Sequence, residues 1–179
     1  MSTESTRRLF IGLMADPVVR EPVLAWRSRW QWPRRPSLSA PAHLHLTLAF
    51  LGDTPEASVD SLRQALAGVR SEPFVLRLGR PQVWPRGLAV VRPDPDRRLD
   101  ELHRQVRQAV ERAGLDPGAG ESWKPHLTLA RRAIGAQPPV EPLALSWPVS
   151  AFSLVWSRLP PLVPRAAYEE IGRWELLTG

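Results

Sequence analysis

Cysteine is absent from the sequence, which excludes disulfide bonds and thiolate metal sites. Long hydrophobic runs are missing too, and a membrane-spanning helix would need roughly 20 apolar residues. The short apolar run near the N-terminus leads directly into Asp16-Pro17, without the small-residue cleavage site of a signal peptide. We therefore expect a soluble, cytoplasmic protein that does not associate with membranes.

Lysine is nearly absent: of the 24 basic residues only Lys124 is a lysine, and the net charge is +6. Arginine suits phosphate recognition because its planar guanidinium can bind two phosphate oxygens at once. The many prolines and alanines are also typical of a GC-rich genome, in which codon bias alone favours arginine over lysine. The positive net charge itself favours a polyanionic partner such as RNA.

The patterns of apolar residues predict an α+β fold within one domain that spans residues 1–179. Alternating or compact apolar runs predict strands at residues 8–14, 43–51, 74–78, 83–93 with a break at 85–87, 123–131, 149–159 and 168–176. Helices are predicted to start at Asp16-Pro17, Thr54-Pro55 and Asp94-Pro95, and the third to stop at Gly114. Residues 32–41, 116–122 and 133–142 are predicted loops.

Two short segments share the tetrapeptide His-Leu-Thr-Leu, at residues 45–48 and 126–129, and they use two of the four histidines in the chain. Alternate residues of a strand point to the same face. The faces opposite the leucines are therefore predicted to carry His43, His45, Thr47 and Ala49 in the first copy and His126, Thr128 and Ala130 in the second. Two similar lobes that face each other would bring both copies to one cleft.

A pair of imidazoles in one cleft suits phosphate-ester chemistry. One takes a proton from an attacking water and the other donates a proton to the leaving oxygen, each contributing about 10²- to 10⁴-fold to the rate. An unperturbed pKa of about 6.5 lets one imidazole be neutral and the other charged near neutral pH. The threonine on the same face can donate a hydrogen bond to a phosphate oxygen. This chemistry requires no nucleophilic side chain and no metal.

The two copies resemble the paired His-x-Thr-x motifs of the two-histidine (2H) phosphoesterases. The segments "RLFIGL", "LAFLGD" and "PHLTLAR" are similar to one branch of them, the RNA 2′,3′-cyclic phosphodiesterases, also called 2′-5′ RNA ligases. The resemblance covers nearly the whole chain. It implies a bilobal α+β fold, with two pseudo-symmetric lobes that each hold an antiparallel sheet and flanking helices, and an active-site cleft between them.

The resemblance also implies a reaction: metal-independent hydrolysis of a terminal 2′,3′-cyclic phosphate to a 2′-phosphate, with reversible 2′-5′ ligation and no cofactor. The substrates would be RNA ends, such as those of tRNA fragments, or cyclic nucleotides, and the protein would act as a monomer. By the same resemblance, His45 is the acid on the departing 3′-oxygen and His126 the base, with the roles exchanged in ligation. Thr47 and Thr128 would bind the phosphate.

Arg131 matches an arginine that contacts the phosphate in this family. In a regular strand it would lie on the face opposite His126, because the two residues are five positions apart. The match therefore predicts a bend or bulge after Ala130, or a side chain that reaches around the end of the strand. Arg132 has the right parity and is the alternative.

Two other functions fit the same residues. His43, His45 and His126 could be the three ligands of a catalytic zinc ion, although the threonines would then have no role. The cleft could instead hold RNA ends without turnover, as a non-catalytic binding module.

Several further side chains near the motifs are open to interpretation. We expect His43 at the rim of the cleft and His103 on the solvated side of the third helix. Three tryptophans, Trp84, Trp123 and Trp156, either pack in the core or stack on nucleobases. Arg34 and Arg35 in the basic loop at residues 32–41 precede the first motif and could flank the mouth of the cleft.

Overall fold

The computed structural model of the protein describes residues 5–118 and 122–177, so the predicted loop at residues 116–122 lies partly outside the described residues. Within these ranges nine strands form one antiparallel sheet in the order β7-β4-β5-β6-β3-β1-β8-β9, with β2 paired to β6. The strands are β1 (Thr6–Met14), β2 (Ser37–Leu38), β3 (His45–Pro55), β4 (Phe74–Trp84), β5 (Leu88–Pro93), β6 (Leu127–Arg131), β7 (Leu145–Val149), β8 (Ala151–Arg158) and β9 (Ala167–Glu175).

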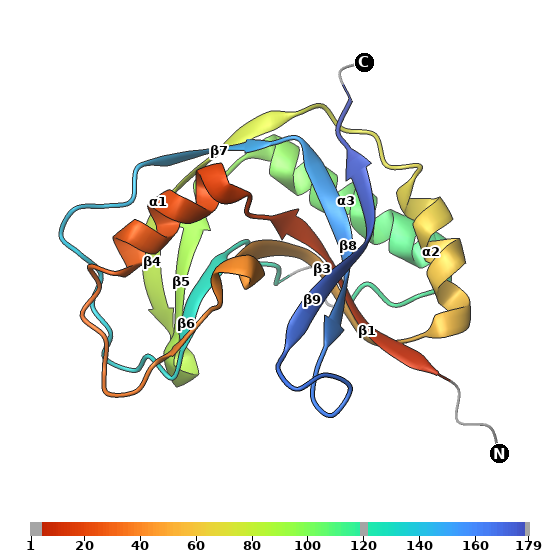
Figure 1. The fold of residues 1–179 in the computed structure, drawn as a ribbon. Coiled ribbons are helices and arrows are strands. Elements are labelled where there is room, and N and C mark those ends of the chain that lie inside the picture. Colours follow the sequence, from red (N-terminus) through yellow and green to blue (C-terminus); the bar gives the residue numbers. More distant parts are fainter. Residues whose placement is uncertain (1–4, 119–121, 178–179) are drawn as a thin grey trace.

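The sheet divides into two halves, β7-β4-β5-β6 and β3-β1-β8-β9, which meet at the two motif strands. At this junction β3 and β6 pair only through Leu46 and Leu127. The α+β class and the antiparallel strands are confirmed. The resemblance implies a separate sheet for each lobe, whereas this single pair joins both halves into one curled sheet (Figure 1).

The described chain has three α-helices, α1 (Pro17–Arg27), α2 (Val59–Leu66) and α3 (Arg97–Arg112). The two longer helices, α1 and α3, each pack on the opposite half of the sheet from the strand that precedes them. α1 follows β1 but contacts β7, and α3 follows β5 but contacts β3 (Figure 1). One continuous apolar core therefore connects the two halves. None of these helices is both long and apolar enough to cross a membrane.

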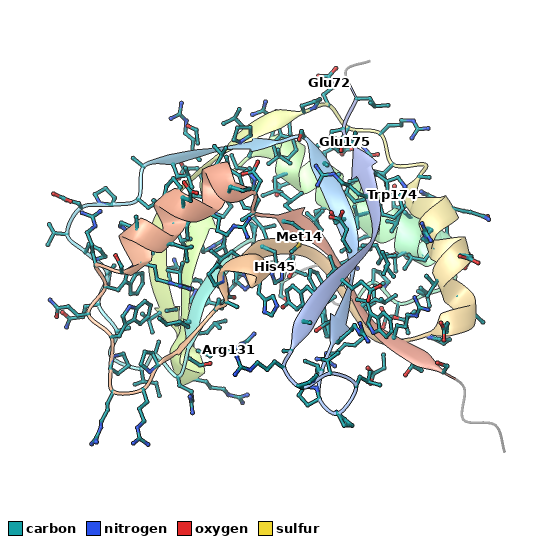
Figure 2. All side chains as sticks on the ribbon, in the orientation of Figure 1. Met14, His45, Glu72, Arg131, Trp174 and Glu175 are labelled. Atoms are coloured by element: carbon teal, nitrogen blue, oxygen red, sulfur yellow. The ribbon has the colours of Figure 1, made fainter. Side chains whose placement is uncertain are left out.

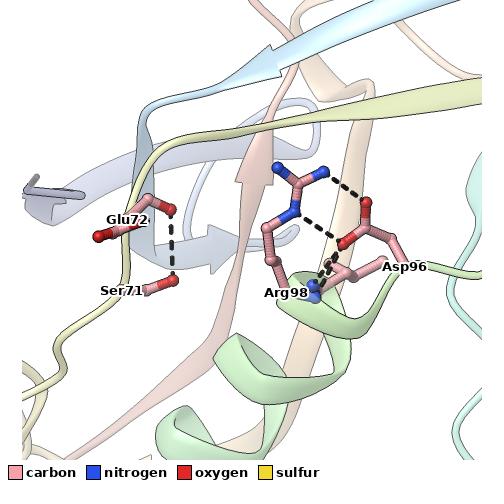
Figure 3. Close-up of polar contacts among 5 residues, drawn as sticks. Ser71, Glu72, Asp96 and Arg98 are labelled. Atoms are coloured by element: carbon pink, nitrogen blue, oxygen red, sulfur yellow. Dashed lines mark hydrogen bonds and ion pairs between the residues drawn. The ribbon is translucent and has the colours of Figure 1, made fainter.

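The helix starts differ from the predicted ones in two of three cases. The side chain of Asp16 caps α1 as expected, accepting a hydrogen bond from the Val19 amide at 3.0 Å. α3 is capped by Asp96 rather than Asp94, since the Asp96 carboxylate accepts from the Arg98 amide at 2.8 Å and also binds the Arg98 guanidinium (Figure 3). α2 starts only at Val59, because β3 continues beside β1 as far as Pro55.

His103 is buried on α3, with 9% of its surface exposed, and not solvated as the sequence suggested. It lies four residues after Leu99 and three before Val106, at the edge of the buried stripe of the helix. Its ring stacks on Trp123, with the ring centroids 3.7 Å apart and the planes within 6°. Burial lowers the pKa of His103 from 6.5 to about 4, and the charge of Arg107 acts in the same direction.

This low pKa predicts a loss of stability in acid. Above pH 6.5 His103 is neutral in both the folded and the unfolded chain. Between pH 6.5 and about 4 only the unfolded chain takes up the proton, so His103 lowers the free energy of unfolding by up to about 3 kcal/mol over this window. His103→Phe keeps a ring against Trp123 but cannot titrate. Urea unfolding at a series of pH values should therefore give a flatter curve for the variant, and parallel curves would contradict this account.

Candidate active site

The histidines and threonines of both motifs line one cleft at the junction of the two sheet halves. The cleft has a volume of about 870 Å³. All five predicted site residues border it: His45, Thr47, His126, Thr128 and Arg131. His45 comes from the β3 half and Arg131 from the end of β6 in the other half (Figure 2).

The two histidines have the same hydrogen-bonding environment. Nδ1 of His45 lies 2.6 Å from the backbone oxygen of His43, and Nδ1 of His126 lies 2.7 Å from that of Lys124. A carbonyl oxygen can only accept, so the proton of each neutral imidazole is on Nδ1. Nε2 of both rings is thereby left unprotonated. In His45 this atom lies 3.0 Å from the Thr47 hydroxyl.

Burial lowers the pKa of both His45 and His126, and the positive charge of Arg131 lowers both further, while the hydrogen bonds to the backbone raise them. The charge of His126 also lowers the pKa of His45. Both imidazoles are therefore predominantly neutral at neutral pH. A phosphate anion placed between them would raise both pKa values, because an opposite charge favours the protonated form. Substrate binding itself can thus supply the acid.

A β-bulge in β6 explains why Arg131 lies in the cleft. Ala130 pairs with Ala89 and Thr128 pairs with Val90, so Leu129 is an extra residue in the ladder. The bulge comes one position earlier than the predicted bend, and it reverses the alternation of the strand. Ala130 is consequently buried in the core, contrary to the prediction that it shares the His126 face, and Arg131 faces the cleft.

Arg132, the alternative to Arg131, follows the end of β6. Its backbone adopts a left-handed conformation with a φ of 53°, and its exposed side chain is not among those that line the cleft. The structure thus places Arg131, and not Arg132, beside the histidines.

The first motif contains the same irregularity. On β1, Ile11 pairs with Ala49 but Gly12 pairs with Thr47, so Leu48 is the extra residue. Ala49 therefore joins the buried core, which again contradicts the predicted face, and Phe50 turns toward the cleft. Phe50 of the first motif thus corresponds to Arg131 of the second. The internal duplication extends from the tetrapeptide to the bulge that follows it.

The model of the 2′-5′ RNA ligase superfamily matches residues 16–159. The chain belongs to this superfamily. It is 36% identical over 174 residues to the RNA 2′,3′-cyclic phosphodiesterase of Thermus thermophilus, covering 88% of this chain and 85% of the relative. It is 31% identical to the Bacillus subtilis protein of the same name, over 93% and 95% of the two chains.

Solved structures of related proteins have a similar fold. The crystal structure of Escherichia coli LigT in apo form matches with a TM-score of 0.82 and 27% identity, over 97% of this chain and 99% of that chain. A Thermus thermophilus crystal structure, TT0787, matches with a TM-score of 0.72 and 29% identity, over 94% and 97%. The chain thus shares its fold with solved phosphoesterase structures.

One further residue of the cleft, Tyr168 on β9, is not predicted by the sequence analysis. The His43 ring stacks on Tyr168 with centroids 4.1 Å apart, and the rings of Tyr168 and His45 form a T-shaped pair with centroids 5.4 Å apart. His43 itself lines the cleft next to the motif strand, as expected. Tyr168 is the only tyrosine of the chain, and this rarity was the one available signal.

The three tryptophans have different surroundings. Trp156 has the guanidinium groups of Arg7 and Arg158 over its ring, at 4.6 and 4.9 Å, and is not among the residues that line the cleft. Trp84 lies against His126, with centroids 4.6 Å apart. Trp123 donates its indole N–H to the backbone oxygen of Thr47 at 3.1 Å. Of the three tryptophans, Trp84 and Trp123 are therefore next to the two motifs, and Trp156 is not.

A zinc site would require His43, His45 and His126 to converge on one point. Among the described residues, no three His, Cys, Asp or Glu side chains are grouped so that they could hold a metal ion. The His43 ring is instead stacked on Tyr168, and Nε2 of His45 faces a hydroxyl. This geometry favours proton transfer over metal binding.

Proposed function

We propose that this protein is an RNA 2′,3′-cyclic phosphodiesterase that hydrolyses a terminal 2′,3′-cyclic phosphate to a 2′-phosphate by acid–base catalysis, without a metal. The observation that carries the proposal is the pair of histidines that face one cleft with the same nitrogen, Nε2, available. Relatives from two bacteria, which match most of the chain, have this name.

In the proposed mechanism the cyclic phosphate binds between the two histidines, and its negative charge raises the pKa of His45, which takes up a proton from solvent. Nε2 of His126 takes a proton from water as the water oxygen bonds to phosphorus. The bond from phosphorus to the 3′-oxygen breaks, and His45 gives that oxygen its proton. The product keeps its 2′-phosphate. His126 is then protonated and His45 neutral, so the proton must return through solvent before the next turnover.

The phosphate oxygens that do not react would be held by the hydroxyls of Thr47 and Thr128 and by the guanidinium of Arg131. In ligation a 5′-hydroxyl takes the place of water: His126 again takes the proton of the nucleophile, His45 again protonates the departing 3′-oxygen, and a 2′-5′ linkage forms. The exchange of roles expected from the resemblance applies instead to cleavage of that linkage, in which the 3′-hydroxyl attacks phosphorus and the 5′-oxygen leaves. Crystal structures of Escherichia coli LigT complexed with 3′-AMP and with phosphate have TM-scores of 0.81 to this chain, which supports a nucleotide phosphate as the ligand.

A product assay tests this function. RNA with a 2′,3′-cyclic phosphate end is incubated with the protein in the presence of a chelator, and the expected product is a 2′-phosphate. Binding of this RNA without turnover would support the alternative of a non-catalytic module. Loss of activity in chelator, with recovery on added zinc, would support the metal site.

We further propose that residues 1–179 act as one domain, as a monomer, and in the cytoplasm. One apolar core runs through both sheet halves, and every proposed site residue comes from the same chain. A second copy is thus not needed to complete the cleft. Light scattering at several protein concentrations should give the mass of a single chain.

The basic loop leads to a prediction on salt dependence. Ser37 and Leu38 of this loop pair with β6 at Arg131 and Ala130 and line the cleft, which supports a position near its mouth for the exposed Arg34 and Arg35. Each phosphate neutralised on a single strand contributes about −0.7 to the slope of log affinity against log salt. Replacing both arginines with alanine should flatten this slope for an oligonucleotide, and should leave cyclic-mononucleotide hydrolysis nearly unchanged. Identical slopes would show that the loop does not bind RNA.

A further inference from the structure

The rings of the two motif histidines have different surroundings. The His45 ring contacts Phe10 on β1 and Tyr168 on β9, with centroids 4.6 and 5.4 Å away. Phe10 and Tyr168 also contact each other edge to face, with centroids 5.0 Å apart. Against His126 the described residues place a single aromatic ring, that of Trp84 at 4.6 Å. The orientation of His45 is therefore more restricted by packing than that of His126.

Tyr168 also supports the group that orients His45. The ring of His43 stacks on Tyr168, with centroids 4.1 Å apart and the planes inclined by 24°. The backbone oxygen of His43 in turn accepts the hydrogen bond from Nδ1 of His45. Tyr168 thus contacts both residues that make this hydrogen bond. For His126 the accepting oxygen belongs to Lys124, whose side chain is exposed.

The pairing of β8 with β9 brings Tyr168 to the cleft. Tyr168 lies opposite Ser157, and residues opposite each other on paired strands share a face of the sheet. Both side chains line the cleft, as do those of Phe10, His43 and His45. The contacts of Tyr168 with these three residues are made by its ring. A phenylalanine in its place could therefore make them, whereas an aliphatic side chain could not.

Orientation matters more for the acid than for the base in the proposed reaction. The acid must give its proton to the departing 3′-oxygen, and the bound phosphate fixes where that oxygen lies. The base takes its proton from a water molecule, which can move toward it. Because a displacement of about 1 Å can cost about 100-fold in rate, a fixed ring has its largest effect at His45.

We propose that Tyr168 is a positioning residue, whose ring holds His45 and the carbonyl group of His43 so that Nε2 of His45 points at the departing 3′-oxygen. This inference rests on the function proposed above. Tyr168 acts through His45 and exchanges no proton itself. Loss of its ring should therefore slow the chemical step and leave substrate binding nearly unaltered.

The first test separates kcat from KM for RNA with a 2′,3′-cyclic phosphate end. Tyr168→Leu should lower kcat about tenfold and change KM less than about twofold. Tyr168→Phe keeps the ring and should recover most of kcat. Trp174→Leu is the matched control, because it removes an aromatic ring from the same strand, β9, at a place outside the cleft (Figure 2). It should leave both constants unaltered.

The second test asks whether Tyr168 acts through His45. In a protein that already carries His45→Ala, the further change Tyr168→Leu has no acid left to displace. The double variant should therefore be less than about twofold slower than His45→Ala alone. A tyrosine that only stabilised the cleft would slow both backgrounds to the same extent.

The third test replaces the departing 3′-oxygen of the cyclic phosphate with sulfur. Water then attacks phosphorus, the bond from phosphorus to sulfur breaks, and the sulfur leaves as a thiolate. A thiol has a pKa of about 8.5, far below that of an alcohol, so this leaving group needs no acid. Tyr168→Leu should lower kcat less than about twofold for the sulfur substrate, whereas Trp84→Leu, which alters the surroundings of the base His126, should lower kcat equally for both substrates.

An equal loss of kcat on the oxygen and sulfur substrates in Tyr168→Leu would overturn the proposal, and so would a full tenfold loss in the His45→Ala background. A loss in Tyr168→Phe as large as that in Tyr168→Leu would also overturn it, because the hydroxyl and not the ring would then be required. If the unaltered protein converts neither substrate, the proposed function itself is wrong. The two failures are therefore distinguishable.

Discussion

The His45→Ala and His126→Ala variants are each expected to lower kcat for RNA with a 2′,3′-cyclic phosphate end by about 100-fold or more. Each change removes one Nε2 atom from the cleft, and with it one of the two proton transfers. The fold should survive, because both side chains face the cleft rather than the core. Single-turnover rates at saturating protein, with circular dichroism as the check on folding, would measure the effect on the chemical step.

Two further variants test whether the proton transfers by His45 and His126 belong to one step or contribute to the rate independently. If both proton transfers belong to one step, the double variant should be little slower than the slower single variant, because each loss already disables that step. His43→Ala removes a third imidazole that lines the same cleft, but its ring stacks on Tyr168, so the loss should stay below about tenfold. Near-native kcat in either single variant of the pair would contradict the assignment.

The sequence could predict that the two motifs lie at one cleft, because the same tetrapeptide occurs twice. A single polar face on one strand is typical of any half-exposed sheet, whereas His-Leu-Thr-Leu occurs at both residues 45–48 and 126–129. The leucines fix which face is buried, and the fold then places both histidines on the same cleft. The residue types indicate the chemistry, and the alternation of residues along each strand indicates the face on which they lie.

The rule that alternate residues of a strand share a face does not hold where the two motif strands contain bulges. A bulge has no unambiguous sequence signature, and the residue after each bulged leucine is an alanine, which fits either face. Regular alternation therefore predicts Ala49 and Ala130 on the polar face, although both are buried. The same bulges move Phe50 and Arg131 into the cleft. Only the match of Arg131 to a phosphate-binding arginine indicated that the second strand could not be regular.

Two other misses have physical reasons as well. The predicted strands include only the last residue of β7, Val149, although its buried residues Trp147 and Val149 alternate with exposed ones. Pro148 and the prolines before it argue against a strand in this part of the sequence. β7 tolerates Pro148 because β7 is an edge strand that pairs only with β4. The predicted exposure of His103 is wrong because a residue at the edge of a helical stripe is buried or exposed according to its tertiary partner, here Trp123.

Arg131→Ala is expected to lower kcat/KM for the cyclic phosphate by about 10- to 100-fold, since hydrogen bonds to a charged group contribute roughly 1.5 to 3 kcal/mol. Arg131→Lys keeps the charge but cannot bind two oxygens in one plane, so it should recover only part of the loss. Thr47→Ala and Thr128→Ala each remove one neutral donor and should have smaller effects, of about 1 kcal/mol.

Arg132→Ala is the matched control, because it removes the same charge one residue along the chain. Its left-handed backbone and its place outside the cleft predict a change in kcat/KM within about twofold. The inhibition constant of inorganic phosphate isolates the binding contribution, and it should rise in Arg131→Ala but not in Arg132→Ala. If Arg132→Ala weakens phosphate inhibition and Arg131→Ala does not, the bulge at Leu129 does not orient the phosphate-binding arginine, and the anion lies on the other side of the strand end.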